Sequence, residues 1–211
     1  MALLEHNLWQ IKHDLRSEQP GVRGSAMQKL HLWAQKDRGI HSAALPIFRA
    51  AVESEQDPWT ATTAAAGIAT IAGRAEGRNA LHALLNHARP EMVARVALSL
   101  TEIADTPLLI ELLQKRPELL IRTAALRALG RLQDPLALPA LLACLASPDL
   151  SAHTMQALAD LGDPKAIPSL EPYLNDTTEL WEEDNHGPMV RVCDLANSTI
   201  QHLRLYPNLK Q

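Results

Sequence analysis

The sequence predicts an all-α fold of about six stacked helical hairpins. A constant offset of 29 residues relates the segment 150–174 to the segment 121–145, so that Asp134 aligns with Asp163. The composition agrees with helices, because 46% of the residues are hydrophobic but only 3% are aromatic. Alanine and leucine dominate, and both favour helices over strands. Repeats of this length are supersecondary units that must stack in order to bury their apolar faces.

Each repeat is predicted to be two helices joined by a short turn. In the clearest repeat, apolar residues follow a 3.6-residue period along 121–132, as one buried helix face requires. Asp134 is expected to cap the next helix, with Pro135 in its first turn, where a missing N–H costs nothing. Small alanines on the first helix allow the second to approach closely. The stripe of the second helix that we expect to be buried is Leu138, Leu141, Leu142 and Leu145.

These residues carry a resemblance to a known family. The resemblance rests on the phrase Ile121-Arg122-x-Ala124-Ala125-x-x-Ala128-Leu129-Gly130-x-Leu132-x-Asp134-Pro135. This phrase resembles the short HEAT repeats of the phycobilisome-lyase type. The resemblance implies a right-handed α-α superhelix, a HEAT-like solenoid, with first helices on the convex side and second helices lining the concave side. It implies little about function, because the family includes scaffolds, lyases and DNA-repair enzymes.

We expect one domain over residues 1–211. Residues 1–20 form an N-terminal capping helix whose outer face is polar, as a terminal repeat requires. About five repeats follow in 21–174, although a glycine-containing stretch replaces the Asp-Pro turn near residue 73. An acidic insert at 175–188 precedes a C-terminal capping repeat at 189–205, whose helix is expected at 190–203.

The insert at 175–188 is the first candidate for partner binding. The period places the last repeat near residue 179, but its Val-Arg signature stands 11 residues later, at 190–191. Insertions in solenoids fall on loops, often on the binding face. Acidic residues beside an aromatic anchor suit a basic protein surface; the alternative is a solvated loop whose tryptophan folds back over the last repeat. The candidate residues are Glu179, Trp181, Glu182, Glu183 and Asp184.

The concave groove is the second candidate. If the leucine stripe of 138–145 is buried, the intervening positions and their equivalents in neighbouring repeats face outward. They form a shallow apolar patch flanked by polar groups, and such patches mark partner sites when they are large enough. The alternative is that neighbouring helices cover most of the patch. The groove candidates are Glu111, Gln114, Ala140, Ala143, Cys144, Pro172 and Tyr173.

No motif predicts catalysis or a bound metal or cofactor. The sequence has no Gly-x-Ser-x-Gly elbow and no His-Glu dipeptide of the kind that di-iron hydroxylases on HEAT-like repeats use. His153 takes the place of Ala124 one repeat earlier, so we interpret it as a semi-buried core histidine. Cys144, partly exposed by its register, and Cys193 are interpreted as free thiols in a reducing compartment.

Charge and hydropathy exclude further classes of partner. The net charge of −4 disfavours nucleic acid and anionic membrane surfaces. No apolar run approaches the roughly 20 residues of a membrane span, and the start of the chain lacks the features of a signal peptide. We therefore expect a cytoplasmic monomer that binds another protein and has no enzymatic activity.

Two classes of function stay open. The first is a protein-binding adaptor or scaffold; a sharper version is an immunity or antitoxin protein that masks a basic toxin domain. The second is a lyase or chaperone-type subunit that handles a tetrapyrrole-like ligand. Such a subunit needs an apolar groove and polar groups for the propionates, to which Arg78, His82 and His87 could contribute.

Overall fold

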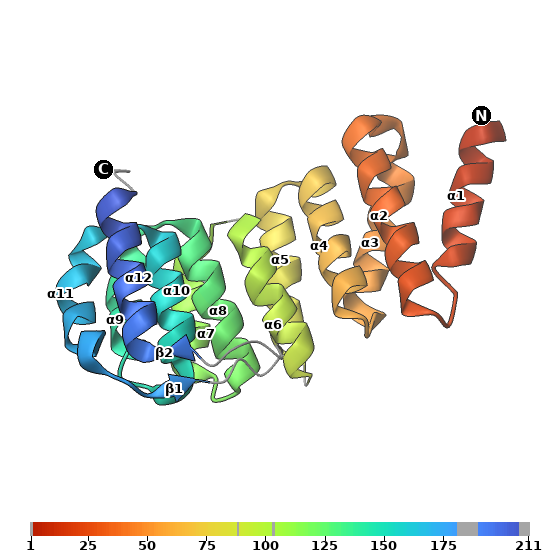
Figure 1. Ribbon diagram of the computed structural model, residues 1–211. Helices are drawn as coiled ribbons and strands as arrows, with labels where there is room; N and C mark the ends of the chain where they lie inside the picture. Colours follow the sequence, from red (N-terminus) through yellow and green to blue (C-terminus); the bar gives the residue numbers. More distant parts are fainter. Residues whose placement is uncertain (1, 88, 103, 181–189, 207–211) are drawn as a thin grey trace. The chain divides into compact units, whose positions relative to one another are not determined.

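The structure is a computed structural model that describes residues 2–87, 89–102, 104–180 and 190–206. The described residues are almost entirely helical, which confirms the all-α prediction. They form two compact units, unit 1 in residues 1–103 and unit 2 in residues 104–211. Unit 1 contains α1 (Ala2–Asp14), α2 (Pro20–Lys36), α3 (His41–Ser54), α4 (Pro58–Ala72), α5 (Arg74–Leu84) and α6 (Pro90–Ser99) (Figure 1). Unit 2 contains α7 (Thr106–Lys115), α8 (Leu119–Leu132), α9 (Leu138–Cys144), α10 (Ser151–Leu161), α11 (Ile167–Leu170), β1 (Glu179–Leu180), β2 (Val190–Arg191) and α12 (Val192–Leu205).

Helix α4 is the centre of unit 1 and packs against α2, α3, α5 and α6. Its residues are mostly small and buried, which lets four helices approach it. Phe48 of α3 is fully buried against Gly67, where a Cβ atom would lie only 2.5 Å from the ring. Helix α1 packs on α2, and its Ile11 is buried.

The first helices of the repeats in unit 2, α8, α10 and α12, lie side by side (Figure 1). Helices α8 and α10 approach so closely that a Cβ atom at Gly130 would lie 2.7 Å from the carbonyl oxygen of Ala157. The predicted buried face of α8 is confirmed for its first five positions, while Leu132 is half-buried. The five buried residues are Ile121, Ala124, Ala125, Ala128 and Leu129.

The turns inside the repeats share a left-handed residue at the 29-residue period. Ala104 and Gln133 both have φ of 54°, and Gly162 has φ of 73°. Each stands directly before the aspartate that starts the second helix. The turn therefore needs a left-handed conformation, which costs an alanine or glutamine about 1–2 kcal/mol and a glycine almost nothing.

The aspartates cap the second helices as predicted. Asp134 Oδ1 accepts a hydrogen bond from the Leu136 N–H at 3.0 Å, and Asp163 Oδ1 accepts one from the Lys165 N–H at 2.9 Å. The Thr106 hydroxyl also donates to Asp134 Oδ2 at 2.6 Å. One aspartate thus caps its own helix and ties it to the preceding repeat.

Three sequence predictions for unit 2 need correction. The last helix begins at Val192 rather than 190, because 190–191 pair as β2 with β1, a strand pair that flanks residues 181–189. His153 is exposed rather than semi-buried, since α10 turns the neighbouring Thr154 into the core. In α9 the buried face is rotated by one position, because the 3₁₀ turn Pro135–Ala137 precedes the helix. Its buried residues are Ala137, Ala140, Leu141, Cys144 and Leu145, while Leu138 and Leu142 are half-buried.

The left-handed turn position gives a pair of substitutions with opposite expected signs. Gly162→Ala should lower the free energy of unfolding by about 1–2 kcal/mol, because alanine is strained at this φ. Ala104→Gly should be neutral or stabilising by up to about 1 kcal/mol, because strain is relieved while the unfolded chain gains entropy. Scanning calorimetry of both variants tests this, and equal destabilisation by both would contradict it.

The close approach of α8 and α10 gives a second prediction. Gly130→Ala should lower the free energy of unfolding by about 1–3 kcal/mol, because the new methyl group must push the backbone of α10 away from α8. The matched control is Gly21→Ala in α2, where no atom lies within 4 Å of the added Cβ. We expect the control to leave the midpoint of urea unfolding unchanged or slightly raised. A Gly130→Ala variant as stable as the control would show that the helices separate freely.

Candidate functional site

We group the exposed residues in the second helices of unit 2, and in the 3₁₀ turns beside them, as the second-helix face: Glu111, Gln114, Leu136, Ala143, Pro172 and Leu174. Positions 114, 143 and 172 are equivalent in the 29-residue period, and all three are exposed. Glu111 is exposed as well, and its Oε1 accepts a hydrogen bond from Lys115 Nζ at 2.8 Å. Tyr173, another predicted groove residue, is half-buried.

Ala140 and Cys144 do not belong to this face, which corrects the predicted groove. They are only 9% and 7% exposed, because the rotated α9 turns them towards α10. Burial raises the pKa of the Cys144 thiol, and the nearby Arg122 offsets only part of this effect. Their neighbour Ala143 stays on the surface.

The most exposed leucine of this face was not predicted from the sequence. Leu136 is 68% exposed and Leu174 is 40% exposed. Leu136 follows the capping Asp-Pro pair, where the next repeat has Lys165. That substitution was the available signal: a position that is lysine in one repeat faces solvent, so a leucine there is exposed.

The acidic insert is described only at its base. Glu179 is exposed in β1 and pairs across the ladder with Arg191 of β2. A hydrogen bond from Arg191 to Asp194, 3.0 Å between Nε and Oδ2, is the main reason that the pKa of Arg191 is raised, and Glu179 adds to the effect. Glu179 is therefore partly balanced by a cation. Trp181, Glu182, Glu183 and Asp184 lie outside the described residues.

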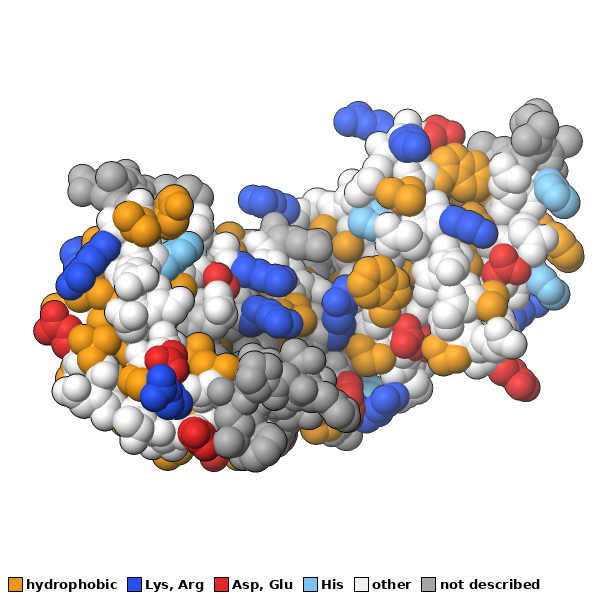
Figure 2. All heavy atoms as spheres, in the orientation of Figure 1, with side chains coloured by type: hydrophobic (Ala, Val, Ile, Leu, Met, Phe, Trp, Pro, Cys, Tyr) orange, Lys and Arg blue, Asp and Glu red, His pale blue; other side chains and the backbone are white. Residues whose placement is uncertain are grey.

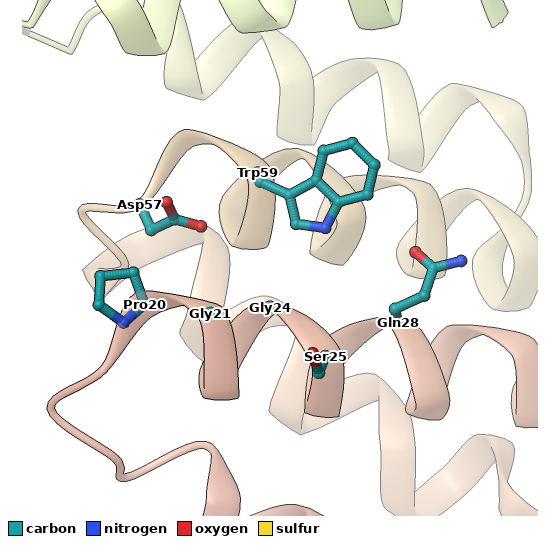
Figure 3. A pocket seen from close by; sticks show the side chains of 7 residues that line it. All are labelled: Pro20, Gly21, Gly24, Ser25, Gln28, Asp57 and Trp59. Carbon is teal, nitrogen blue, oxygen red and sulfur yellow. The ribbon is translucent and has the colours of Figure 1, made fainter.

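Unit 1 contains a hollow of about 480 Å³ between α2 and α4 that sequence reasoning did not find. In Figure 3, Trp59 leans from the start of α4 over the first turns of α2, with Asp57 and Pro20 at one end and Gln28 at the other. The available signal was the pair of glycines three residues apart on one helix, which leaves room for a large side chain of a facing helix. The lining residues are Pro20, Gly21, Gly24, Ser25, Gln28, Asp57 and Trp59.

Trp59 is partly exposed to solvent and also contacts a cationic side chain. Its side chain is 48% exposed, and the guanidinium carbon of Arg95 in α6 lies 4.3 Å from the ring centroid. Arg95 Nε is enclosed and has no hydrogen-bond acceptor among the described residues. Hydrophobic and basic side chains adjoin on the surface of unit 1 (Figure 2).

A largely buried ion pair connects α2 to the segment just before α4, and so joins the two walls of the hollow. Arg23 of α2 donates to both oxygens of Glu55, at 2.8 and 2.9 Å. The same carboxylate accepts a hydrogen bond from the Asp57 N–H at 2.8 Å. Asp57 Oδ2 in turn accepts the Thr60 N–H at 2.8 Å and caps α4. This chain of contacts fixes the start of α4, and with it Trp59, against α2.

The residues considered for a tetrapyrrole do not line this hollow. Arg78 Nε lies 3.5 Å from His82 Nε2 on α5, and His87 Nε2 lies 3.2 Å from Gln56 Oε1. Within the described ranges, no three His, Cys, Asp or Glu side chains come together as a metal ion would need. In the same part of the chain, no helix has both the length and the apolar character to cross a membrane.

Comparison with known proteins agrees with the observed hairpins. A family model of HEAT repeats matches residues 78–152 and, overlapping, residues 106–182. The chain contains HEAT repeats. The match does not confirm the phycobilisome-lyase type within HEAT repeats. Comparison with curated proteins gives no match.

One solved structure among the matches shows the same helical-repeat fold. The X-ray structure of YibA from E. coli is 18% identical, with a TM-score of 0.53 over 92% of this chain. The chain spans 66% of the length of that structure. Two engineered proteins are 18% and 17% identical over 94% of this chain, with TM-scores of 0.44 and 0.45, and the match covers 98% and 58% of their chains.

The Arg23–Glu55 pair predicts how the stability of unit 1 depends on pH. Burial acts to raise the pKa of Glu55, but hydrogen bonds from Arg23 and from the Asp57 backbone outweigh it and hold that pKa below 4.5. The folded state then binds fewer protons than the unfolded state. The stabilisation is therefore complete above the unfolded pKa and is lost as the pH falls through the folded pKa.

We expect the melting temperature of the wild type to fall more steeply below pH 4.5 than that of Glu55→Gln. The control is Glu53→Gln, which removes an exposed carboxylate of α3 close in sequence. Its acid profile should follow the wild type. If Glu55→Gln also follows the wild type through this range, the ion pair does not contribute to acid sensitivity.

Proposed function

We propose that this protein is a non-enzymatic adaptor or scaffold that binds a protein partner through the second-helix face of unit 2 and the insert at 175–188. The observation that carries the proposal is the exposure of Leu136, at 68%, in repeats whose equivalent positions 114, 143 and 172 are also exposed. HEAT repeats form extended surfaces suited to holding another protein.

The composition of the face supports a protein partner. Leu136 and Leu174 supply apolar area that is lost from water on binding, while Glu111 and Gln114 supply exposed polar groups. Interfaces between proteins combine apolar area with polar groups of this kind. The face is carried by helices, so little conformational entropy is lost when a partner docks.

The charge of the chain supports a partner with a basic surface. The net charge is −4, and acidic residues concentrate in the insert, of which Glu179 is described at its base. Opposite charge on a partner would speed association and set its orientation more than it would raise affinity. Against an enzymatic role, the burial that raises the pKa of the Cys144 thiol makes it a poor nucleophile at neutral pH.

The proposal predicts that Leu136→Asp weakens partner binding at least roughly tenfold without unfolding the chain. The side chain is exposed, so the substitution should change the free energy of unfolding by no more than about 0.5 kcal/mol. The control is Leu205→Asp at the end of α12, where the leucine is 71% exposed. The measurement is affinity capture from the source cell's lysate with mass spectrometry, followed by titration of the captured protein.

One stoichiometric protein should bind the wild type and Leu205→Asp equally, and Leu136→Asp at least roughly tenfold more weakly. Equal affinity for all three forms would remove the second-helix face as the contact. Recovery of a pigment or other small molecule instead of a protein would favour the ligand-handling alternative.

A further inference from the structure

We propose that the hollow beside Trp59 in unit 1 docks a peptide segment of a partner protein in which a bulky apolar side chain stands next to a carboxylate. The apolar group enters the hollow, and the carboxylate binds Arg95. The site lies in unit 1 and uses none of the residues of the second-helix face, so it stands independently of the function proposed above.

The hollow has the walls that an apolar side chain needs. Its floor is the bare backbone of α2 at Gly21 and Gly24, with Pro20 at one end (Figure 3). A Cβ atom at Gly24 would lie 3.1 Å from Cδ1 of Trp59, so a larger residue there would displace the indole. The volume of about 480 Å³ accepts a leucine or phenylalanine side chain, which would gain contact with the half-exposed indole.

Arg95 supplies the charge. Its guanidinium carbon lies over the Trp59 ring, 4.3 Å from the centroid, and this cation–π contact restrains the position of the group. The guanidinium makes no hydrogen bond within the described residues, and Nε is its one nitrogen found to be both enclosed and without a partner there. A guanidinium fixed in this way matches a carboxylate through two parallel hydrogen bonds.

The other charges around the hollow already have partners. Arg23 is paired with Glu55, and Asp57 accepts two hydrogen bonds from Thr60, from N–H at 2.8 Å and from the hydroxyl at 2.6 Å. Arg89 lies 3.7 Å from Glu91. Among the described cations near Trp59, Arg95 therefore has no carboxylate partner. A carboxylate of the bound peptide would form the missing ion pair.

The same charges favour a peptide over a nucleic acid. Asp57 lines the hollow itself, and Glu91 on α6 already has Arg89 at 3.7 Å, so a polyanion would meet a carboxylate beside the single arginine that lacks one. A peptide brings a single negative charge to Arg95 and an apolar group to the hollow. Because tryptophan and arginine dominate binding hot spots, a short segment is enough for measurable affinity.

The test begins with a random peptide library displayed on phage and panned against the full chain. Enriched peptides should carry Asp or Glu within two residues of Leu, Phe or Trp. Their synthetic versions are then titrated by fluorescence anisotropy against variants. Trp59→Ala and Arg95→Gln should each weaken binding at least roughly tenfold, and Arg95→Gln should also flatten its salt dependence.

A third variant keeps the stacked pair intact. Ser25→Phe places a ring from an exposed position of α2 into the hollow and should compete with the peptide, again weakening it at least roughly tenfold. Trp9→Ala and Arg49→Gln are matched controls, because both remove an exposed side chain of the same type from elsewhere in unit 1. Circular dichroism and melting temperatures confirm that each variant is folded.

Peptides without an enriched acidic residue, or acidic peptides that bind Trp59→Ala and Ser25→Phe as tightly as the wild type, would overturn the proposal. So would an empty selection, or a single-stranded oligonucleotide that binds at Trp59 in place of peptides. Leu136→Asp should leave peptide affinity unchanged, so failure here and failure of the second-helix face are separate results.

Discussion

The close approach of neighbouring helices through small residues is the constraint on which both units depend. Gly67 admits the ring of Phe48, and Gly130 lets α8 rest on the backbone of α10 at Ala157. Dispersion contacts are individually weak, so helices without large apolar side chains stabilise each other only at such short distances. The same device forms the hollow in unit 1: Gly24 leaves backbone bare, and the facing residue there is a large indole that reaches the surface.

Each candidate surface results from the packing of the repeats together with one residue that departs from the repeat pattern. Leu136 takes a solvent-facing position that is lysine one repeat later, and Trp59 stands at the first turn of α4, beside a capping aspartate. Each surface lies inside one unit and is held by helix packing, and in unit 1 by the Arg23–Glu55 pair as well. Rigid support of this kind lets a few exposed side chains act as a binding site, because they are ordered before the partner arrives.

Sequence reasoning succeeded where the period was strong and failed where a local turn altered it. The buried face of α8 and the capping role of Asp134 follow from spacing alone. The prediction that Ala140 and Cys144 are exposed was wrong, because a 3₁₀ turn before α9 rotates the buried face of that helix by one position. The strand pair at 179–180 and 190–191 was not foreseen, since two-residue strands leave no alternating pattern to detect.

By itself, the sequence determined that the chain is all-helical, that its hairpins repeat every 29 residues and that aspartates begin the second helices. These features depend on periodicity and on capping within a few residues. Only the tertiary structure decided that Arg95 stacks on Trp59, that Arg23 clamps Glu55 and that Leu136 is left outside. Those contacts join residues about 30 positions apart or depend on the rotation of one helix against another, and the free energy that selects them comes from packing between repeats, which no local pattern records.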